Sequence, residues 1–138
     1  MNLARSICAM TFAVVALCPA GLLSPNALQA KDMKPIAFAT GANSASFKGD
    51  IEGMDRDIYP VTAKAGQTMK VTVTNKLKLV LFHLQLPGKA GKYLPGAGED
   101  DDATTWQGTL PESGTYKIIV GAMRGKDTTY TLDVAITN

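Results

Sequence analysis

The sequence has 138 residues, with 14 Lys and Arg against 12 Asp and Glu and a formal net charge of +2. This near balance, without any run of Lys or Arg, argues against a nucleic-acid or anionic-membrane partner. Both cysteines, Cys8 and Cys18, lie close to the N-terminus. A domain formed by the later residues therefore has no disulfide and must be stabilised by its core alone.

The first thirty residues have the pattern of a secretory signal peptide. A basic residue is followed by an apolar run over 7–17, and small residues before Lys31 offer a cleavage site. The apolar run is too short to span a bilayer as a stable anchor. We therefore expect residues 1–30 to be removed on export to the periplasm, leaving 31–138 as a single domain without a membrane anchor.

Alternating apolar and polar residues predict β-strands through the rest of the chain. In the stretch 68–75, for example, every second residue is Met or Val and the residues between them are Lys and Thr. Gly and Pro separate such runs, and none of them has the periodicity of a helix. We expect about eight strands, near 35–40, 45–51, 57–63, 68–75, 79–86, 104–109, 115–121 and 128–137. The predicted fold is an all-β antiparallel sandwich, which buries one face of each strand.

Few side chains after residue 30 could carry out catalysis. His83 is the only histidine, and its place in an apolar strand favours a residue packed on a sheet. No serine lies in a nucleophile-elbow sequence, and the Cys and His ligands of a zinc site are missing. The acidic run 99–102 is typical of a solvated loop, with calcium binding as an open alternative. We therefore expect a binding protein rather than an enzyme, with no cofactor and no metal.

Four short motifs are recognisable by their residue order. They are Gly49-x-Ile51-x-Gly53, Asp55-x-Asp57-x-Tyr59, Ala65-Gly66-Gln67 and Leu110-Pro111-x-Ser113-Gly114-x-Tyr116. With them, residues 36–137 resemble the bacterial periplasmic inhibitors of goose-type (g-type) lysozyme, the PliG family. The motifs also resemble the pre-peptidase C-terminal (PPC) type of β domain, which is attached to secreted enzymes. A signal peptide followed by one domain favours the inhibitor. The alternative is a non-inhibitory PPC-like module that binds polysaccharide or an envelope protein.

The resemblance to PliG implies a mechanism and a set of contact residues. Loops of the domain would enter the substrate cleft of the lysozyme, where an Arg can pair with the catalytic carboxyl group. By position, the candidate contact residues are Ser113, Gly114, Tyr116, Arg124, Met54 and Arg56. At Met54 the chain departs from the family, which can carry an aromatic residue there. Tyr116 could instead be a buried tyrosine corner, and Ser113 and Gly114 could simply form the turn. Because one extended strand separates Ser113 from Arg124, we expect these two residues to lie far apart.

Overall fold

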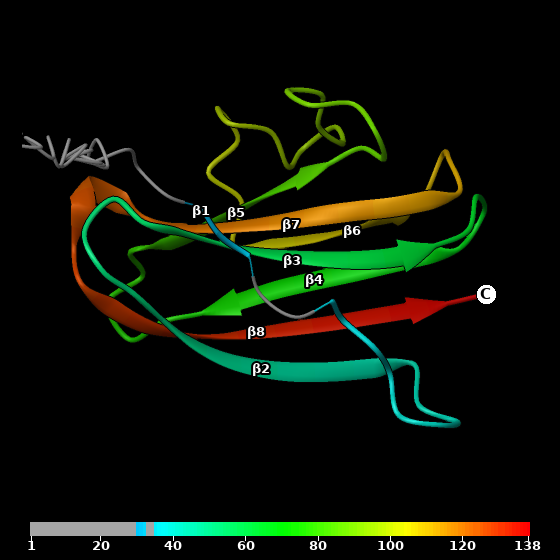
Figure 1. The fold of residues 1–138 in the computed structure, drawn as a ribbon, viewed down its shortest axis with the longest axis horizontal. Coiled ribbons are helices and arrows are strands. Elements are labelled where there is room, and N and C mark those ends of the chain that lie inside the picture. Colours follow the sequence, from blue (N-terminus) through cyan, green and yellow to red (C-terminus); the bar gives the residue numbers. More distant parts are fainter. Residues whose placement is uncertain (1–29, 33–34) are drawn as a thin grey trace, which may run out of the picture.

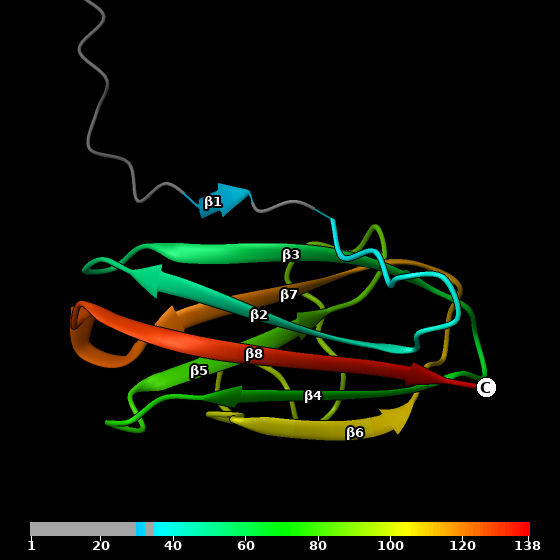
Figure 2. The ribbon, with the colours of Figure 1, turned by 90° about the horizontal axis from the view of Figure 1, so that it is seen from below.

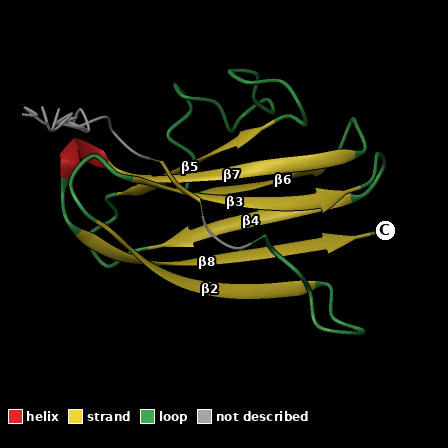
Figure 3. Cartoon of the chain, viewed as in Figure 1, coloured by secondary structure: helices red, strands yellow, loops and turns green. Residues whose placement is uncertain are grey.

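The computed structural model describes residues 30–32 and 35–138. They form two four-stranded sheets that pack face to face, with one short 3-10 turn (Figures 1 and 3). The elements are β1 (Ala30–Asp32), β2 (Ser44–Ile51), β3 (Arg56–Ala63), β4 (Thr68–Thr74), β5 (Val80–Gln85), β6 (Thr105–Thr109), β7 (Gly114–Ala122), η1 (Met123–Gly125) and β8 (Thr128–Thr137). The first sheet has the order β1-β3-β7-β5 and the second the order β2-β8-β4-β6. Apart from Ala30, the expected signal peptide lies outside the described residues.

Seven of the eight expected strands are confirmed, each within one residue at either end. The strand expected at 35–40 is wrong. Only Ile36 forms an isolated bridge there, with its backbone N–H bonded to the carbonyl oxygen of Pro60 at 2.8 Å. Pro60 lies in β3 and has no N–H, which removes a ladder bond upstream of Ile36, and residues 37–40 form no ladder. Instead, β1 pairs with β3 further upstream, and this pairing is parallel.

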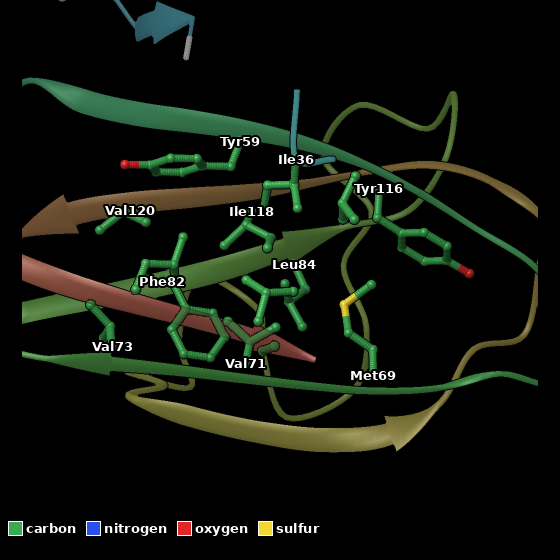
Figure 4. Packing of buried hydrophobic residues seen from close by; sticks show 14 of the residues in the cluster. Ile36, Tyr59, Met69, Val71, Val73, Phe82, Leu84, Tyr116, Ile118 and Val120 are labelled. Carbon is green, nitrogen blue, oxygen red and sulfur yellow. The ribbon is translucent and has the colours of Figure 1, made fainter. Parts of the chain in front are cut away.

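The core lies between the two sheets and is built from the alternating apolar side chains (Figure 4). Phe82 and Leu84 of β5 and Ile118 of β7 point inward from the first sheet. Met69 and Val71 of β4 meet them from the second sheet, and all five side chains are fully buried. The alternation of apolar and polar residues in the sequence of these strands therefore matches the alternation of buried and exposed side chains in the sandwich.

The long loop at 87–103 is bonded to the outer edge of β5. The backbone N–H groups of Phe82 and Leu84 donate to the carbonyl oxygens of Ala103 and Ala97, both at 2.9 Å, and Leu94 donates back to Leu84 at 2.9 Å. Leu94, Ala97 and Ala103 are also buried. The loop thus takes the place of a further strand and covers a sheet edge that would otherwise expose unpaired backbone groups.

A chain of three buried polar side chains joins the two sheets. The hydroxyl of Tyr130 in β8 donates to Asp57 Oδ2 in β3 at 2.6 Å, and it lies 2.6 Å from the hydroxyl of Tyr59. Tyr130 is paired with Gly49 of β2, where a β-carbon would lie 2.5 Å from the tyrosine oxygen. Only glycine at position 49 leaves room for this ring. The motif residues Gly49, Asp57 and Tyr59 therefore have a structural explanation.

We expect Gly49→Ala to lower the free energy of unfolding by about 1–3 kcal/mol, because the added methyl overlaps the Tyr130 ring. Gly121→Ala is the matched control, since a β-carbon there meets only Arg56 Cγ at 3.7 Å. Urea unfolding of both variants measures the difference. Equal stability of the two variants would contradict the packing described for Tyr130.

The same network predicts how stability depends on pH. Burial raises the pKa of Tyr130, as do its bonds to Asp57 and Tyr59, and burial also raises the pKa of Tyr59. A raised folded-state pKa means that the neutral tyrosine is favoured, so its contribution is complete below the unfolded pKa of about 10 and is lost as pH rises above it. We expect each such tyrosine to lower the free energy of unfolding by about 1.4 kcal/mol for each pH unit above the unfolded pKa. Urea titrations at pH 9 to 11 should show a smaller loss for Tyr130→Phe. An unchanged slope would contradict the assignment.

Candidate functional site

The candidate contact residues are divided between the two ends of the sandwich (Figures 1 and 2). Strand β7 runs unbroken between them, with Ser113 just before its first residue and Arg124 just after its last. Its nine residues span about 30 Å at roughly 3.3 Å each. The expectation that Ser113 and Arg124 lie far apart is confirmed.

The residues around Ser113 serve the fold. Ser113 Oγ accepts a hydrogen bond from the backbone N–H of Ala65 at 2.8 Å, which ties this turn to the β3–β4 turn. Gly114 has a φ of +148°, and a β-carbon there would lie 2.7 Å from Pro87 Cβ. Tyr116 is 0% exposed, and its hydroxyl donates to the carbonyl oxygen of Glu112 at 2.6 Å. Of the two alternatives for Tyr116, the structure supports the buried tyrosine corner. Its buried side chain cannot touch a partner in this conformation.

At the other end, two turns join into one surface, which we name the tip and define as residues 52–55 and 123–127. The backbone N–H of Gly53 donates to Asp127 Oδ1 at 2.7 Å, so the β2–β3 turn is fixed to the turn after β7. A β-carbon on Gly125 would lie 3.0 Å from Met54 Sδ. The tip therefore brings Met54 beside the turn that carries Arg124, although about seventy residues separate them in the sequence.

Two tip residues are exposed in ways that packing does not explain. The Met54 side chain is 58% exposed, one of two large apolar side chains so placed among the described residues. Arg124 is exposed, and no ion pair within the described part of the chain includes it. Its φ is +57°, in the left-handed region that non-glycine residues seldom adopt. Lys78 and Asp102 also have a positive φ among the described residues, so this conformation alone does not single out Arg124.

Arg56, the remaining candidate, lies at the start of β3 and faces away from the core. It lines a cavity of about 180 Å³ on the outer face of the first sheet, together with Met54 of the tip. His83 lines the same cavity from β5. Burial lowers the pKa of His83, and the neighbouring positive charge of Arg56 lowers it further. The sequence predicted that His83 lies on a sheet, and the structure confirms this. Nothing in the sequence indicated the cavity.

The acidic run is engaged in local contacts. The hydroxyl of Tyr93 donates to Glu99 Oε1 at 2.7 Å, and Asp101 Oδ2 accepts the backbone N–H of Gly98 at 2.7 Å. Within residues 30–32 and 35–138, no group of three or more possible metal ligands comes together. No described helix has the length and apolar character needed to cross a membrane.

We expect Arg124→Gly to raise the free energy of unfolding by up to about 1 kcal/mol. Glycine relieves a backbone cost of about 1–2 kcal/mol, which exceeds the entropic cost of about 0.5–1 kcal/mol that glycine introduces. Arg124→Ala keeps the unfavourable φ and should leave stability within about 0.5 kcal/mol of the parent. Urea unfolding distinguishes the two, and a destabilised Arg124→Gly protein would show that the Arg side chain supports the fold.

Comparison with other proteins agrees with this architecture. No family profile matches the chain. The inhibitor of g-type lysozyme of Escherichia coli (strain K12) is 29% identical over 130 residues, which cover 83% of this chain and 89% of that protein. The crystal structure of Aeromonas hydrophila PliG, a periplasmic inhibitor of g-type lysozyme, is 38% identical, with a TM-score of 0.64 over 79% of this chain and all of that one.

A second structural likeness concerns the fold alone. The pre-peptidase C-terminal domain of a Bacillus anthracis collagenase is 18% identical, with a TM-score of 0.54 over 80% of this chain and 98% of that domain. The sandwich is therefore shared with PPC domains, as the sequence motifs indicated. The similar proteins at higher identity are inhibitors rather than enzymes. Because it is 38% identical to the Aeromonas protein over the whole of that protein, the chain belongs to the PliG family of periplasmic g-type lysozyme inhibitors.

Proposed function

We propose that this protein binds a g-type lysozyme and blocks its substrate cleft. The observation that carries the proposal is the 38% identity to Aeromonas hydrophila PliG over the whole of that chain. Inhibition of this kind needs no chemical step, only a complex that lasts longer than a catalytic cycle.

The tip is the part of the molecule that we propose enters the cleft. A lysozyme needs a protonated carboxyl group to cleave its polysaccharide. The guanidinium of Arg124 can form two parallel bonds to such a carboxyl group and keep it occupied. Met54 supplies a flexible apolar surface next to it, which suits a pocket of irregular shape. Both side chains project from turns that are bonded to each other, so little loop ordering is needed on binding.

The Ser113 end contributes indirectly in this proposal. Ser113, Gly114 and Tyr116 hold the turn that begins β7, and β7 in turn carries Arg124 at its other end. One cleft cannot easily receive both ends of a strand that spans about 30 Å. We therefore propose Met54, Arg124 and the adjacent Arg56 as the contacts, and the Ser-Gly-x-Tyr motif as a support.

The proposed location follows from the relatives. The Aeromonas and Salmonella Typhimurium PliG proteins are described as periplasmic inhibitors. We propose that residues 1–30 direct this chain to the same compartment and are removed there. The remaining domain, 31–138, would then meet a lysozyme before it reaches the cell wall.

Lysis of a cell-wall suspension tests the proposed function. We expect the purified protein, at micromolar concentration, to protect the suspension from a goose-type lysozyme more strongly than from a chicken-type one. Arg124→Ala should weaken inhibition by about thirtyfold, which corresponds to the roughly 2 kcal/mol of a hot-spot residue. Arg124→Gly should be a poor inhibitor although it is at least as stable as the parent.

The matched control is Lys64→Ala, which removes an exposed positive charge from the β3–β4 turn at the opposite end of the sandwich. It should change inhibition by less than about threefold, as for an exposed charge outside the proposed contact. Absence of protection against the goose-type enzyme would overturn the proposed function. Protection that survives Arg124→Ala unchanged would overturn the proposed contact at the tip and leave the function standing.

A further inference from the structure

The outer cavity of the first sheet holds charged groups that the fold leaves unpaired. Arg56 lines it from β3, Asp55 lines it from the tip, and Glu99 and Asp102 line it from the long loop that covers β5. Among the described residues, the ion pair within 4.0 Å is that of Lys89 with Glu112, so Arg56 is paired with none of the three acids. Charges of both signs thus line one small space without touching each other.

The histidine in this cavity adds an unsatisfied polar atom. His83 Nδ1 is buried and has no hydrogen-bond partner in the described part of the chain. The ring is fixed by an edge contact with Tyr93, whose centroid is 5.7 Å away. Because Nδ1 is closed off from solvent, it cannot bond a molecule in the cavity, and the carboxylates of the loop are the acceptors that the cavity offers. Glu99 is fixed as well, because its Oε1 accepts the Tyr93 hydroxyl.

The size and lining of the cavity limit what could bind. A volume of about 180 Å³ limits the occupant to a small molecule. Leu81 and Met123 supply an apolar part of the lining. A suitable occupant is therefore small, carries one charge of each sign, and has a short apolar group.

We propose that this cavity binds a small zwitterion with an amino and a carboxylate group, either a free amino acid or a short peptide. The carboxylate pairs with the Arg56 guanidinium. The ammonium group donates to Glu99 and Asp102. Leu81 and Met123 pack against the short side chain. The cavity shares Arg56 and Met54 with the proposed lysozyme contact, but ligand binding is measured without lysozyme, so either proposal can fail alone.

Methionine-methyl NMR tests the proposal directly, because Met54 and Met123 line the cavity while Met69 is buried in the core. The protein, labelled on its methionine methyl groups, is titrated with alanine and separately with the dipeptide Ala-Ala. We expect saturable shifts of the Met54 and Met123 signals and none of the Met69 signal. Saturation by alanine at lower concentration identifies a free amino acid as the preferred ligand, and the reverse order identifies a peptide.

Charge-deleted probes and variants test the assigned roles. N-acetylalanine lacks the ammonium and alanine amide lacks the carboxylate, and each should bind about tenfold more weakly than alanine, as for the loss of one charge-assisted bond. The double variant Glu99→Gln, Asp102→Asn and the single variant Arg56→Gln should lose about as much. Asp100→Asn is the control, because Asp100 is in the same acidic run but does not line the cavity. The proposal is overturned by the absence of saturable shifts, by equal binding of all three alanine probes, or by an equal effect of Asp100→Asn.

Discussion

The hydrogen-bonded chain from Asp57 through Tyr130 to Tyr59 is the constraint on which the rest of the structure depends. It joins β3 of one sheet to β8 of the other within the buried interior. A buried carboxylate is tolerated only where its oxygens are bonded, so the two sheets can approach only in the register that brings Tyr130 to Asp57. That register also requires Gly49 beneath the ring. The motif residues Gly49, Asp57 and Tyr59 therefore determine how the two sheets pack against each other.

The same network supports the end of the molecule that carries the tip. Asp57 follows Arg56 directly in β3, and the tip begins just before them. The β2–β3 turn is held on one side by the buried network and on the other by the bond from Gly53 to Asp127. The β2–β3 turn can then present Met54 in one conformation beside the turn that carries Arg124. Such preorganisation lowers the entropic cost of binding. A large buried contact area does not give this advantage by itself.

The long loop has a different role from that of the tip. Its backbone completes the hydrogen bonding of β5, and its buried Leu94, Ala97 and Ala103 belong to the core. Because it passes over the outer face of the first sheet, it also brings carboxylates opposite Arg56. The cavity thus arises from the way in which the sheet edge is covered. A mobile loop could not hold charges in this way.

The sequence by itself determined the strands, because alternation with a period of two is a local property that each strand carries in its own residues. It also determined the fold class, and the motifs that placed the chain beside PliG proteins. It could not exclude a strand at 35–40, since whether this stretch pairs depends on the edge of β3, a different segment of the chain. Only the tertiary structure decided that Tyr116 is buried, that Met54 lies beside Gly125, and that Arg56 and Glu99 line one cavity. These are pairings between distant segments, and they depend on how the two sheets pack, which no single stretch of the chain encodes.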